Sequence, residues 1–232
     1  MTDAAVDVPI QASETTATSV DAQAPDTPVQ ADTALPVAAT DAALLEVEAQ
    51  IEALTIDKSK ANWRTKLKKP SIVTFTPGKT YLWLLHTDHG DLQIALRPDV
   101  APMHVTSTLY LTMLGFYDSL VFHRIIKQFM AQGGDPLGTG TGGPGYKYGL
   151  EVDPNVKHDA AGVLSMANAG PGTEGSQFFL TFGAQPALDG SYSVFGKVIK
   201  GLETLQAIEA EGTVGEGTPG KVTILSATVA VQ

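Results

Sequence analysis

At 232 residues with no cysteine, the chain can form one sizeable domain, and disulfides, thiolate metal sites and cysteine nucleophiles are excluded. Apolar runs of about 18 residues or more are lacking, so the sequence predicts no membrane-spanning helix. The net charge of −10 and the lack of a basic patch argue against a nucleic-acid partner.

The acidity is confined to the amino-terminal part of the chain. Residues 1–57 hold 11 Asp and Glu and no Lys or Arg, whereas the rest holds 14 acidic and 15 basic residues. Residues 1–40 have no aromatic residue and too little apolar surface to offset the entropy of ordering, so we expect a disordered acidic tail. The first residues lack the features of a secretory signal, which predicts a cytoplasmic protein.

A helix and an extended arm are expected over residues 41–79. Asp41 is a suitable N-cap, and apolar residues recur at near-helical spacing from Leu44 to Leu54. Trp63 then indicates an arm that packs against the main domain.

Residues 80–232 are expected to form the folded domain, which is mainly β. Short apolar or alternating stretches are separated by Gly-rich turns, and helical spacing recurs in two places. The expected strands cover 81–86, 92–97, 121–126, 129–134, 162–167, 177–182, 194–199 and 222–231, and the expected helices cover about 102–116 and 202–210. This pattern indicates a closed or nearly closed antiparallel barrel with helices over its ends.

The stretch from Val121 to Asp135 carries an unusual side chain for a strand. An arginine among apolar residues is costly to bury without a partner, so Arg124 either lies at a sheet edge with its head in water or has a functional role. Strict alternation places Phe122, Arg124 and Ile126 on one face, and His123 and Ile125 on the other.

The sequence contains no motif that indicates a standard catalytic, metal-binding or cofactor-binding site. No two of the five histidines form a helical metal pair, and Ser176 lies outside a Gly-x-Ser-x-Gly motif. The glycines from Gly138 to Gly143 match a dinucleotide fingerprint, but no helix follows them, so we expect a flexible surface loop. We expect no metal and no cofactor.

Three sequence blocks stand in order between about residues 81 and 232. They are Phe122-His-Arg-Ile-Ile126 with Phe129-Met-Ala-Gln-Gly-Gly-Asp135, then Leu164-Ser-Met-Ala-Asn-Ala-Gly-Pro171 with Gly175-Ser-Gln-Phe-Phe179, then Leu188-Asp-Gly190 with Val194-Phe-Gly-Lys197. These blocks resemble the cyclophilins, the peptidyl-prolyl cis-trans isomerases, in a bacterial-like form with an amino-terminal extension. The resemblance implies an eight-stranded antiparallel barrel capped by two α-helices.

The resemblance also implies a set of site residues. It makes Arg124 the catalytic arginine, with Gln132 and Asn168 beside it in the catalytic group. The substrate-binding residues that it implies are Phe129, Met130, Ala167, Gln177, Phe179, Leu188 and Tyr192.

These residue types suit rotation about the bond that precedes proline. Amide resonance sets a barrier of about 18–20 kcal/mol, and no bond has to be made or broken. A pocket that binds the twisted amide better than the planar one therefore suffices. An apolar notch can hold the proline ring, while a guanidinium can donate to the nitrogen whose lone pair localises during the twist.

The implied partners are proline-containing peptides and unfolded or partly folded proteins. Many family members have Trp where Ala187 stands, so weak binding of cyclosporin, the family's inhibitor, is expected. Composition favours a monomer. The alternative to an active isomerase is a non-catalytic cyclophilin-fold module that captures proline-containing segments.

Overall fold

The computed structural model of the chain describes residues 41–215 and 221–232. The disordered tail expected over residues 1–40 lies outside the described residues. None of the described helices is long and apolar enough to cross a membrane.

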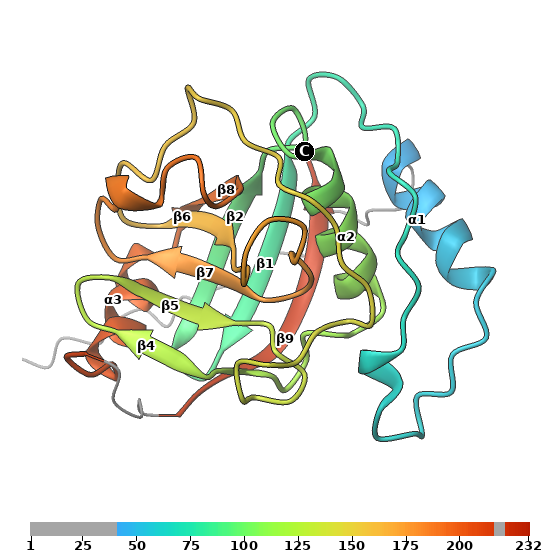
Figure 1. The fold of residues 1–232 in the computed structure, drawn as a ribbon. Coiled ribbons are helices and arrows are strands. Elements are labelled where there is room, and N and C mark those ends of the chain that lie inside the picture. The colour runs from blue at the N-terminus through green and yellow to red at the C-terminus, as the bar shows by residue number, and fades with distance from the viewer. Residues whose placement is uncertain (1–40, 216–220) are drawn as a thin grey trace, which may run out of the picture. The chain divides into compact units, whose positions relative to one another are not determined.

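The described elements are mostly strands, as expected (Figure 1). The helices are α1 (Ala42–Glu52), α2 (Pro102–Met113) and α3 (Leu202–Ala210), with 3₁₀ turns at Trp63–Thr65 and Pro186–Leu188. The strands are β1 (Tyr81–Thr87), β2 (Gly90–Leu96), β3 (Val121–Phe122), β4 (Arg124–Ile126), β5 (Met130–Gly133), β6 (Val163–Met166), β7 (Phe178–Thr181), β8 (Val194–Lys200) and β9 (Val222–Val231).

The strands form one antiparallel sheet that curls into a nearly closed barrel. Their order is β3-β9-β1-β2-β8-β6-β7-β5-β4. The two ends of this order, β3 and β4, are separated in the chain by His123 alone. The short segment from Val121 to Ile126 therefore joins both ends of the sheet, and the eight expected strands become nine because this segment is interrupted.

The interruption at His123 changes which side chains face the core. Phe122 and Ile125 are both buried, and the Phe122 ring contacts Phe178 edge-on at 5.8 Å between centroids. Strict alternation does not allow residues 122 and 125 to share a face. The expected common face for Phe122 and Arg124 is therefore wrong, because the strand slips by one residue at His123.

The barrel interior beside β4 is a row of fully buried cross-strand partners. Ile125 pairs with Ala131, Ala131 with Leu180, and Leu180 with Leu164. Because side chains alternate along a strand, the neighbours of these four residues lie on the outer face of the barrel. The predicted site residues of β4, β5 and β7 are among those neighbours.

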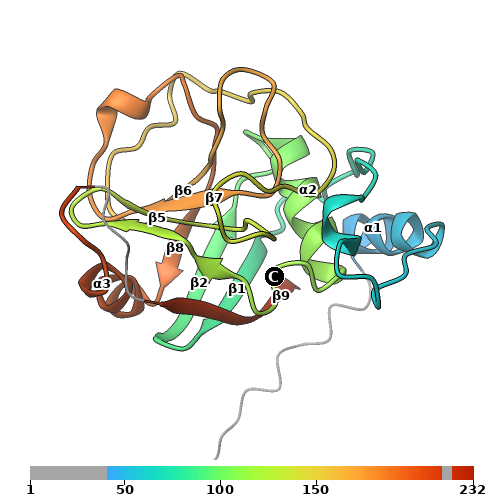
Figure 2. The same ribbon diagram turned by 60° about the horizontal axis from the view of Figure 1, so that its bottom comes forward.

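Helix α2 is buried on nearly all sides, from Met103 to Thr112. It lies between β9 and α1, as two views of the ribbon show (Figures 1 and 2). Helix α1 turns Ala43, Leu44 and Val47 toward this contact.

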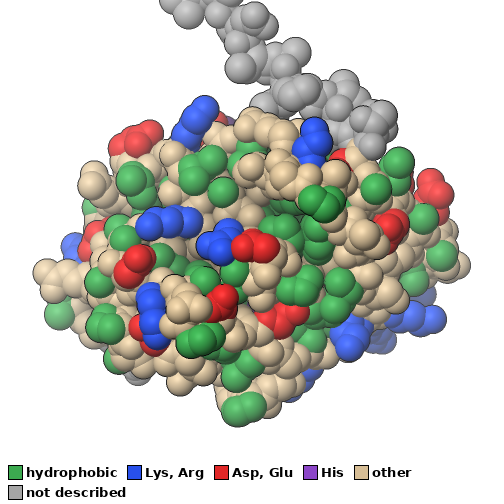
Figure 3. All heavy atoms as spheres, turned by 90° about the horizontal axis from the view of Figure 1, so that it is seen from above, with side chains coloured by type: hydrophobic (Ala, Val, Ile, Leu, Met, Phe, Trp, Pro, Cys, Tyr) green, Lys and Arg blue, Asp and Glu red, His purple; other side chains and the backbone are tan. Residues whose placement is uncertain are grey.

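On the face shown in Figure 3, apolar side chains are interrupted by charged ones of both signs.

Asp41 joins the arm (residues 41–79) to the barrel. Its carboxylate accepts hydrogen bonds from the backbone N–H of Ala43, the hydroxyl of Thr76 and the hydroxyl of Tyr81, at 2.9–3.0 Å. The first bond caps α1, as expected from the sequence, and the third reaches the first residue of β1. One side chain therefore fixes the start of the helix and the end of the arm.

We expect Asp41→Ala to lower the free energy of unfolding by about 1–3 kcal/mol, since a helix cap and two further hydrogen bonds are lost. Urea denaturation of the full chain measures this change. The matched control is Asp57→Ala, because Asp57 is exposed and bonds only to neighbouring residues. Equal effects of both substitutions would contradict the role of Asp41.

Candidate active site

Arg124, Gln132 and Phe179 form a row across three neighbouring strands. Arg124 pairs with Gln132 between β4 and β5, and Gln132 pairs with Phe179 between β5 and β7. Directly opposed residues lie about 4.5–5.5 Å apart at their Cβ atoms. The register thus brings a guanidinium, an amide and an aromatic ring together on the outer face of the barrel.

Two further expected site residues lie next to this row. Met130 is two residues from Gln132 on β5, so it shares the same face, and it is almost fully buried. Phe129 lies in the turn before β5, where its carbonyl accepts a hydrogen bond from the backbone N–H of Phe182 at 3.0 Å. Met130 and Phe179 therefore form a packed floor, and Phe129 stands half-buried at its edge.

Gln132 is held by a second amide. Its Nε2 donates to Oε1 of Gln177 at 2.8 Å. The Nε2 of Gln177 donates in turn to the carbonyls of Gly140 and Gly142, at 3.0 and 2.8 Å. This chain orients both amides and connects them to the glycine-rich loop.

Ala167 and Asn168 follow β6 and lie beside the amide pair. The Ala167 N–H donates to the Gln177 carbonyl at 2.8 Å. The Nδ2 of Asn168 donates to the Ser191 carbonyl at 3.0 Å and to Oε1 of Glu174 at 3.3 Å. The Asn168 side chain is therefore positioned by two partners from separate loops.

Leu188 and Tyr192 come from one loop between β7 and β8. The Tyr192 ring meets the Phe179 ring edge-on, at 5.6 Å between centroids. Leu188 ends a 3₁₀ turn, where it is half-buried, and Ala187 before it is exposed. Gln185 ties the loop to the β4–β5 turn, because its Nε2 donates to the Gln128 carbonyl at 2.8 Å.

Asp135 organises the glycine-rich loop that follows β5. Its buried carboxylate accepts hydrogen bonds from the backbone N–H groups of Leu137, Thr139 and Gly140 at 2.6–2.9 Å. Burial alone raises the pKa of Asp135, but the backbone hydrogen bonds outweigh it and hold the pKa below its usual range. The loop expected to be flexible is thus fixed around one carboxylate, and Gln177 binds two of its carbonyls.

His123 is a half-buried neighbour of Arg124 without hydrogen-bond partners for its ring nitrogens among the described residues. Burial lowers its pKa, the charge of Asp135 raises it, and the nearby charge of Arg124 lowers it. The net shift is downward, so His123 is neutral at neutral pH. The positive charge at this point of the strand then belongs to Arg124.

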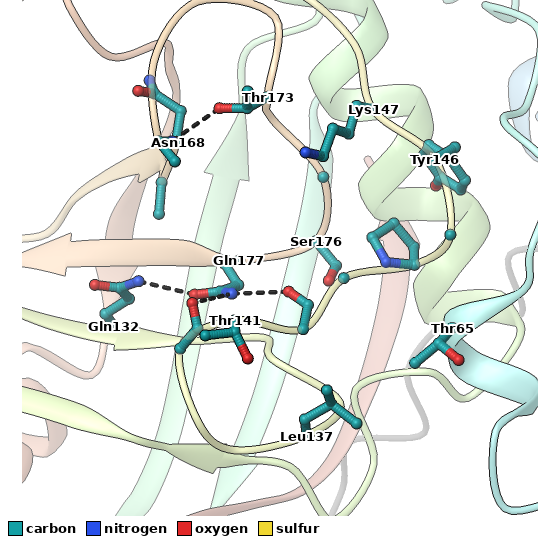
Figure 4. A pocket seen from close by; sticks show the side chains of 18 residues that line it. Thr65, Gln132, Leu137, Thr141, Tyr146, Lys147, Asn168, Thr173, Ser176 and Gln177 are labelled. Atoms are coloured by element: carbon teal, nitrogen blue, oxygen red, sulfur yellow. Dashed lines mark hydrogen bonds between the residues drawn. The ribbon is translucent and has the colours of Figure 1, made fainter.

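A groove of about 880 Å³ runs beside the row (Figure 4). Four of the expected site residues line it, namely Gln132, Ala167, Asn168 and Gln177. Arg124, Phe129, Met130, Phe179, Leu188 and Tyr192 lie outside its lining. The groove is therefore adjacent to the expected proline pocket and meets it at the amide-bearing residues.

A Ser-His-Asp chain, in which the serine and the histidine are buried, supports the site. His158 Nδ1 lies 2.9 Å from Asp189 Oδ1, and His158 Nε2 lies 3.0 Å from Ser165 Oγ. Ser165 and His158 are at most 1% exposed, and the Ser165 hydroxyl also bonds the Ser193 carbonyl. No substrate reaches this serine, so the chain is not a hydrolytic triad. It ties the loop that carries Leu188 to β6, beneath the ring of Phe179.

Sequence reasoning missed several of these supporting residues. His158 and Asp189 act through a contact between distant segments, Asp135 binds the loop that directly follows it, and Thr65 of the arm lines the groove. The Asp135-to-Gly140 spacing is the one local signal, since a carboxylate before a glycine-rich turn often binds its N–H groups. Within the described residues, no cluster of three or more His, Cys, Asp or Glu side chains could hold a metal ion.

Comparisons with known proteins place this arrangement in a family. The family model described as "Cyclophilin type peptidyl-prolyl cis-trans isomerase/CLD" matches residues 82–229. Peptidyl-prolyl cis-trans isomerase CYP18-1 of Arabidopsis thaliana is 49% identical over 132 residues, which cover 56% of this chain and 82% of the relative. Peptidyl-prolyl cis-trans isomerase-like 3 of Gallus gallus is 53% identical over 128 residues, or 54% of this chain and 80% of the relative.

A solved structure shows the same fold. The crystal structure of a cyclophilin-type peptidyl-prolyl cis-trans isomerase from Cryptosporidium parvum, determined in the presence of the dipeptide Ala-Pro, matches with a TM-score of 0.61 and 38% identity. The match covers 64% of this chain and 98% of that protein. The arm lies outside the residues that the family model covers.

Asp135→Asn is expected to lower the free energy of unfolding at neutral pH by about 1–3 kcal/mol, because several hydrogen bonds to a charged group are weakened. A depressed folded-state pKa gives stability that is present above the unfolded-state value of about 3.9 and lost as pH falls through the folded-state value. The difference in unfolding free energy between the two proteins should therefore shrink as the pH falls below about 5 and passes through the lowered folded-state pKa of Asp135.

Urea unfolding across this pH range measures the gap. Asp159→Asn is the control, since Asp159 is exposed and its one ion pair, with Lys197, is 3.9 Å long. A gap that does not change with pH would contradict the assignment to the Asp135 carboxylate.

Proposed function

This chain belongs to the cyclophilin-type peptidyl-prolyl cis-trans isomerases, and we propose that it isomerises X-Pro bonds through Arg124, set beside an apolar proline pocket. The observation that carries the proposal is the cross-strand row of Arg124, Gln132 and Phe179 on the outer face of the barrel.

Isomerisation of an X-Pro bond requires that the twisted amide be stabilised. When the X-Pro bond twists, resonance is lost and the lone pair localises on the prolyl nitrogen. A hydrogen bond donated to that nitrogen is stronger in the transition state than in either planar state, which is the condition for catalysis. Arg124 supplies this donor, and its planar fork also fixes the direction of the hydrogen bond.

The neighbours of Arg124 suit the remaining tasks. Phe129, Met130, Phe179 and Leu188 offer the apolar surface for the proline ring, with Tyr192 at the rim. Gln132, Ala167 and Asn168 bind the peptide backbone, and Gln177 holds Gln132 in place. Each amide has a partner that orients it before substrate arrives, so little reorganisation is needed on binding.

Exposed proline-containing segments of peptides and of partly folded proteins are the proposed substrates. The Cryptosporidium relative crystallised in the presence of Ala-Pro supports this class of ligand. We also propose that the chain acts as a monomer. Large exposed apolar side chains come from separate parts of the chain: Leu45 from α1, Val152 from the segment between β5 and β6, and Leu225 from β9.

Arg124→Gln should lower kcat/KM for a short Ala-Pro peptide by about 10²–10³-fold, the usual effect of removing one preorganised electrostatic group. Arg124→Lys should restore only part of the rate, because an ammonium lacks the planar fork. Proline exchange measured by NMR gives the rates, and circular dichroism checks the fold.

Arg97→Gln is the matched control for Arg124→Gln. Arg97 is exposed, pairs with Asp99 at 2.8 Å and directly follows β2, which is five strands away from β4 in the sheet order. Its substitution should leave the rate unchanged. A folded Arg124→Gln protein with the full rate would overturn the mechanism, and no rate in any variant would favour a binding module.

Ala187 should make cyclosporin a weak ligand while leaving isomerase activity intact. A methyl group at this exposed position supplies neither the indole surface nor its N–H donor. Ala187→Trp should tighten cyclosporin binding by about 10-fold or more, since burying an aromatic side chain is worth about 1.5–3 kcal/mol. Calorimetric titration measures both affinities, and nanomolar binding by the unsubstituted chain would refute the expectation.

A further inference from the structure

We propose that the arm forms part of the peptide-binding surface and favours peptides whose flank beyond the X-Pro unit carries acidic side chains. The inference rests on the proposed function, because it concerns the substrate of the same site. It assigns a role to a segment that the family model leaves uncovered.

The groove connects the proposed substrate contacts to the arm. Gln132 and Gln177 line one end of the groove, and Thr65 of the arm lines the other (Figure 4). Glycines 140, 142, 143 and 145 also line the groove, and they contribute no side chains to it. A peptide that extends from the amide pair therefore reaches the arm within one continuous hollow.

The arm is fixed at this place by several contacts. The backbone N–H of Leu67 donates to the Pro144 carbonyl at 2.8 Å. Arg64 Nη2 donates to the Asp118 carbonyl at 2.9 Å, and the Trp63 ring meets Phe116 edge-on. The arm thus presents a positioned surface rather than a loose strand.

Gly145 makes the fit between the arm and the groove possible. A Cβ atom at this position would lie 2.7 Å from the Thr65 carbonyl oxygen and 2.9 Å from the Leu67 nitrogen. The backbone at Gly145 also has φ of +99°, which side chains rarely allow. The loop and the arm are therefore in direct backbone contact at the wall of the groove.

The groove lining and the arm beside it carry basic side chains. The lining contains one charged side chain, Lys147, and no Asp or Glu. The basic segment of the arm, residues 58–69, holds six Lys and Arg and no acidic residue. Lys66, which follows Thr65, is exposed and borders a second hollow beside residues 53–56, outside the groove lining. Lys68 and Lys69 are exposed too, and none of the three has an ion pair among the described residues.

Two carboxylates lie behind the lining, those of Glu174 and Asp135, and both are buried out of reach of a bound peptide. Glu174 is fully buried, is absent from the lining, and its Oε1 accepts a hydrogen bond from Asn168. A peptide carboxylate in the groove would gain attraction from the exposed ammonium groups of Lys147 and Lys66, whereas a basic flank would be repelled.

The test compares peptides that share one Ala-Pro centre and differ in a flank of glutamates or glutamines, placed before or after the proline. We expect kcat/KM to be about two- to five-fold higher for the glutamate peptide on one side, the effect of partly exposed ion pairs at low salt. The ratio should approach one at about 0.5 M salt, where such charges are screened.

Lys66→Gln combined with Lys147→Gln should also bring the ratio toward one. Lys197→Gln combined with Lys200→Gln is the matched control, since both lysines are exposed on β8, outside the groove lining. This pair makes the same charge change and should keep the ratio. A ratio of one in the unsubstituted chain on both sides, or a ratio that survives the double substitution, would overturn the inference.

The outcomes for the two proposals are separable. Turnover of a short, uncharged Ala-Pro peptide reports on the proposed function alone. Calorimetric affinities of the glutamate and glutamine peptides report on the charge preference whether or not turnover is seen. Equal affinities together with normal turnover would remove the inference and leave the function standing.

Discussion

The slip of one residue at His123 is the constraint on which the site depends. It lets Phe122 enter the core next to Gly133, whose missing side chain leaves room for the ring. It then turns Arg124 outward in register with Gln132 and Phe179. A regular strand would place Phe122 and Arg124 on one face, and either the aromatic ring would lose its burial or the guanidinium would enter the barrel interior. The same segment joins both ends of the sheet, so closure of the barrel and exposure of the arginine have one cause.

The arrangement uses preorganised amides rather than reactive groups. Gln132, Gln177 and Asn168 each have a hydrogen-bond partner before substrate binds, and the glycine-rich loop is held by the Asp135 carboxylate. The buried Ser165-His158 pair shows that interatomic distances alone do not establish a catalytic role. Its spacing suits nucleophilic catalysis, yet full burial restricts it to support of the loop that carries Leu188. The solvent exposure of a side chain and the hydrogen-bond donors around it determine what chemistry it can perform.

Local sequence patterns predicted the features that depend only on neighbouring residues, such as strands, helices and helix caps. The strands, the cap at Asp41 and helix α3 follow from alternation, capping chemistry and helical spacing, and the structure confirms them. The slip at His123 could not be predicted, because alternation assumes an unbroken strand. The contacts of Leu67 with Pro144 and of His158 with Asp189 join segments that no periodicity relates. The family resemblance supplied the members of the proposed site, whereas Thr65 of the arm, which lines the groove, lies beyond the residues that the family model covers.

Because Gly145 has no side chain, the loop at this residue can contact the backbone of Thr65–Leu67, which lies far away in the sequence. Engineers who wish to transplant the amino-terminal extension onto another barrel of this family would have to carry this glycine with it. Without it, the graft would be attached through its connection to β1 but would not seat against the loop. Conversely, a bulkier residue at 145 offers a way to detach the extension while its own sequence stays intact.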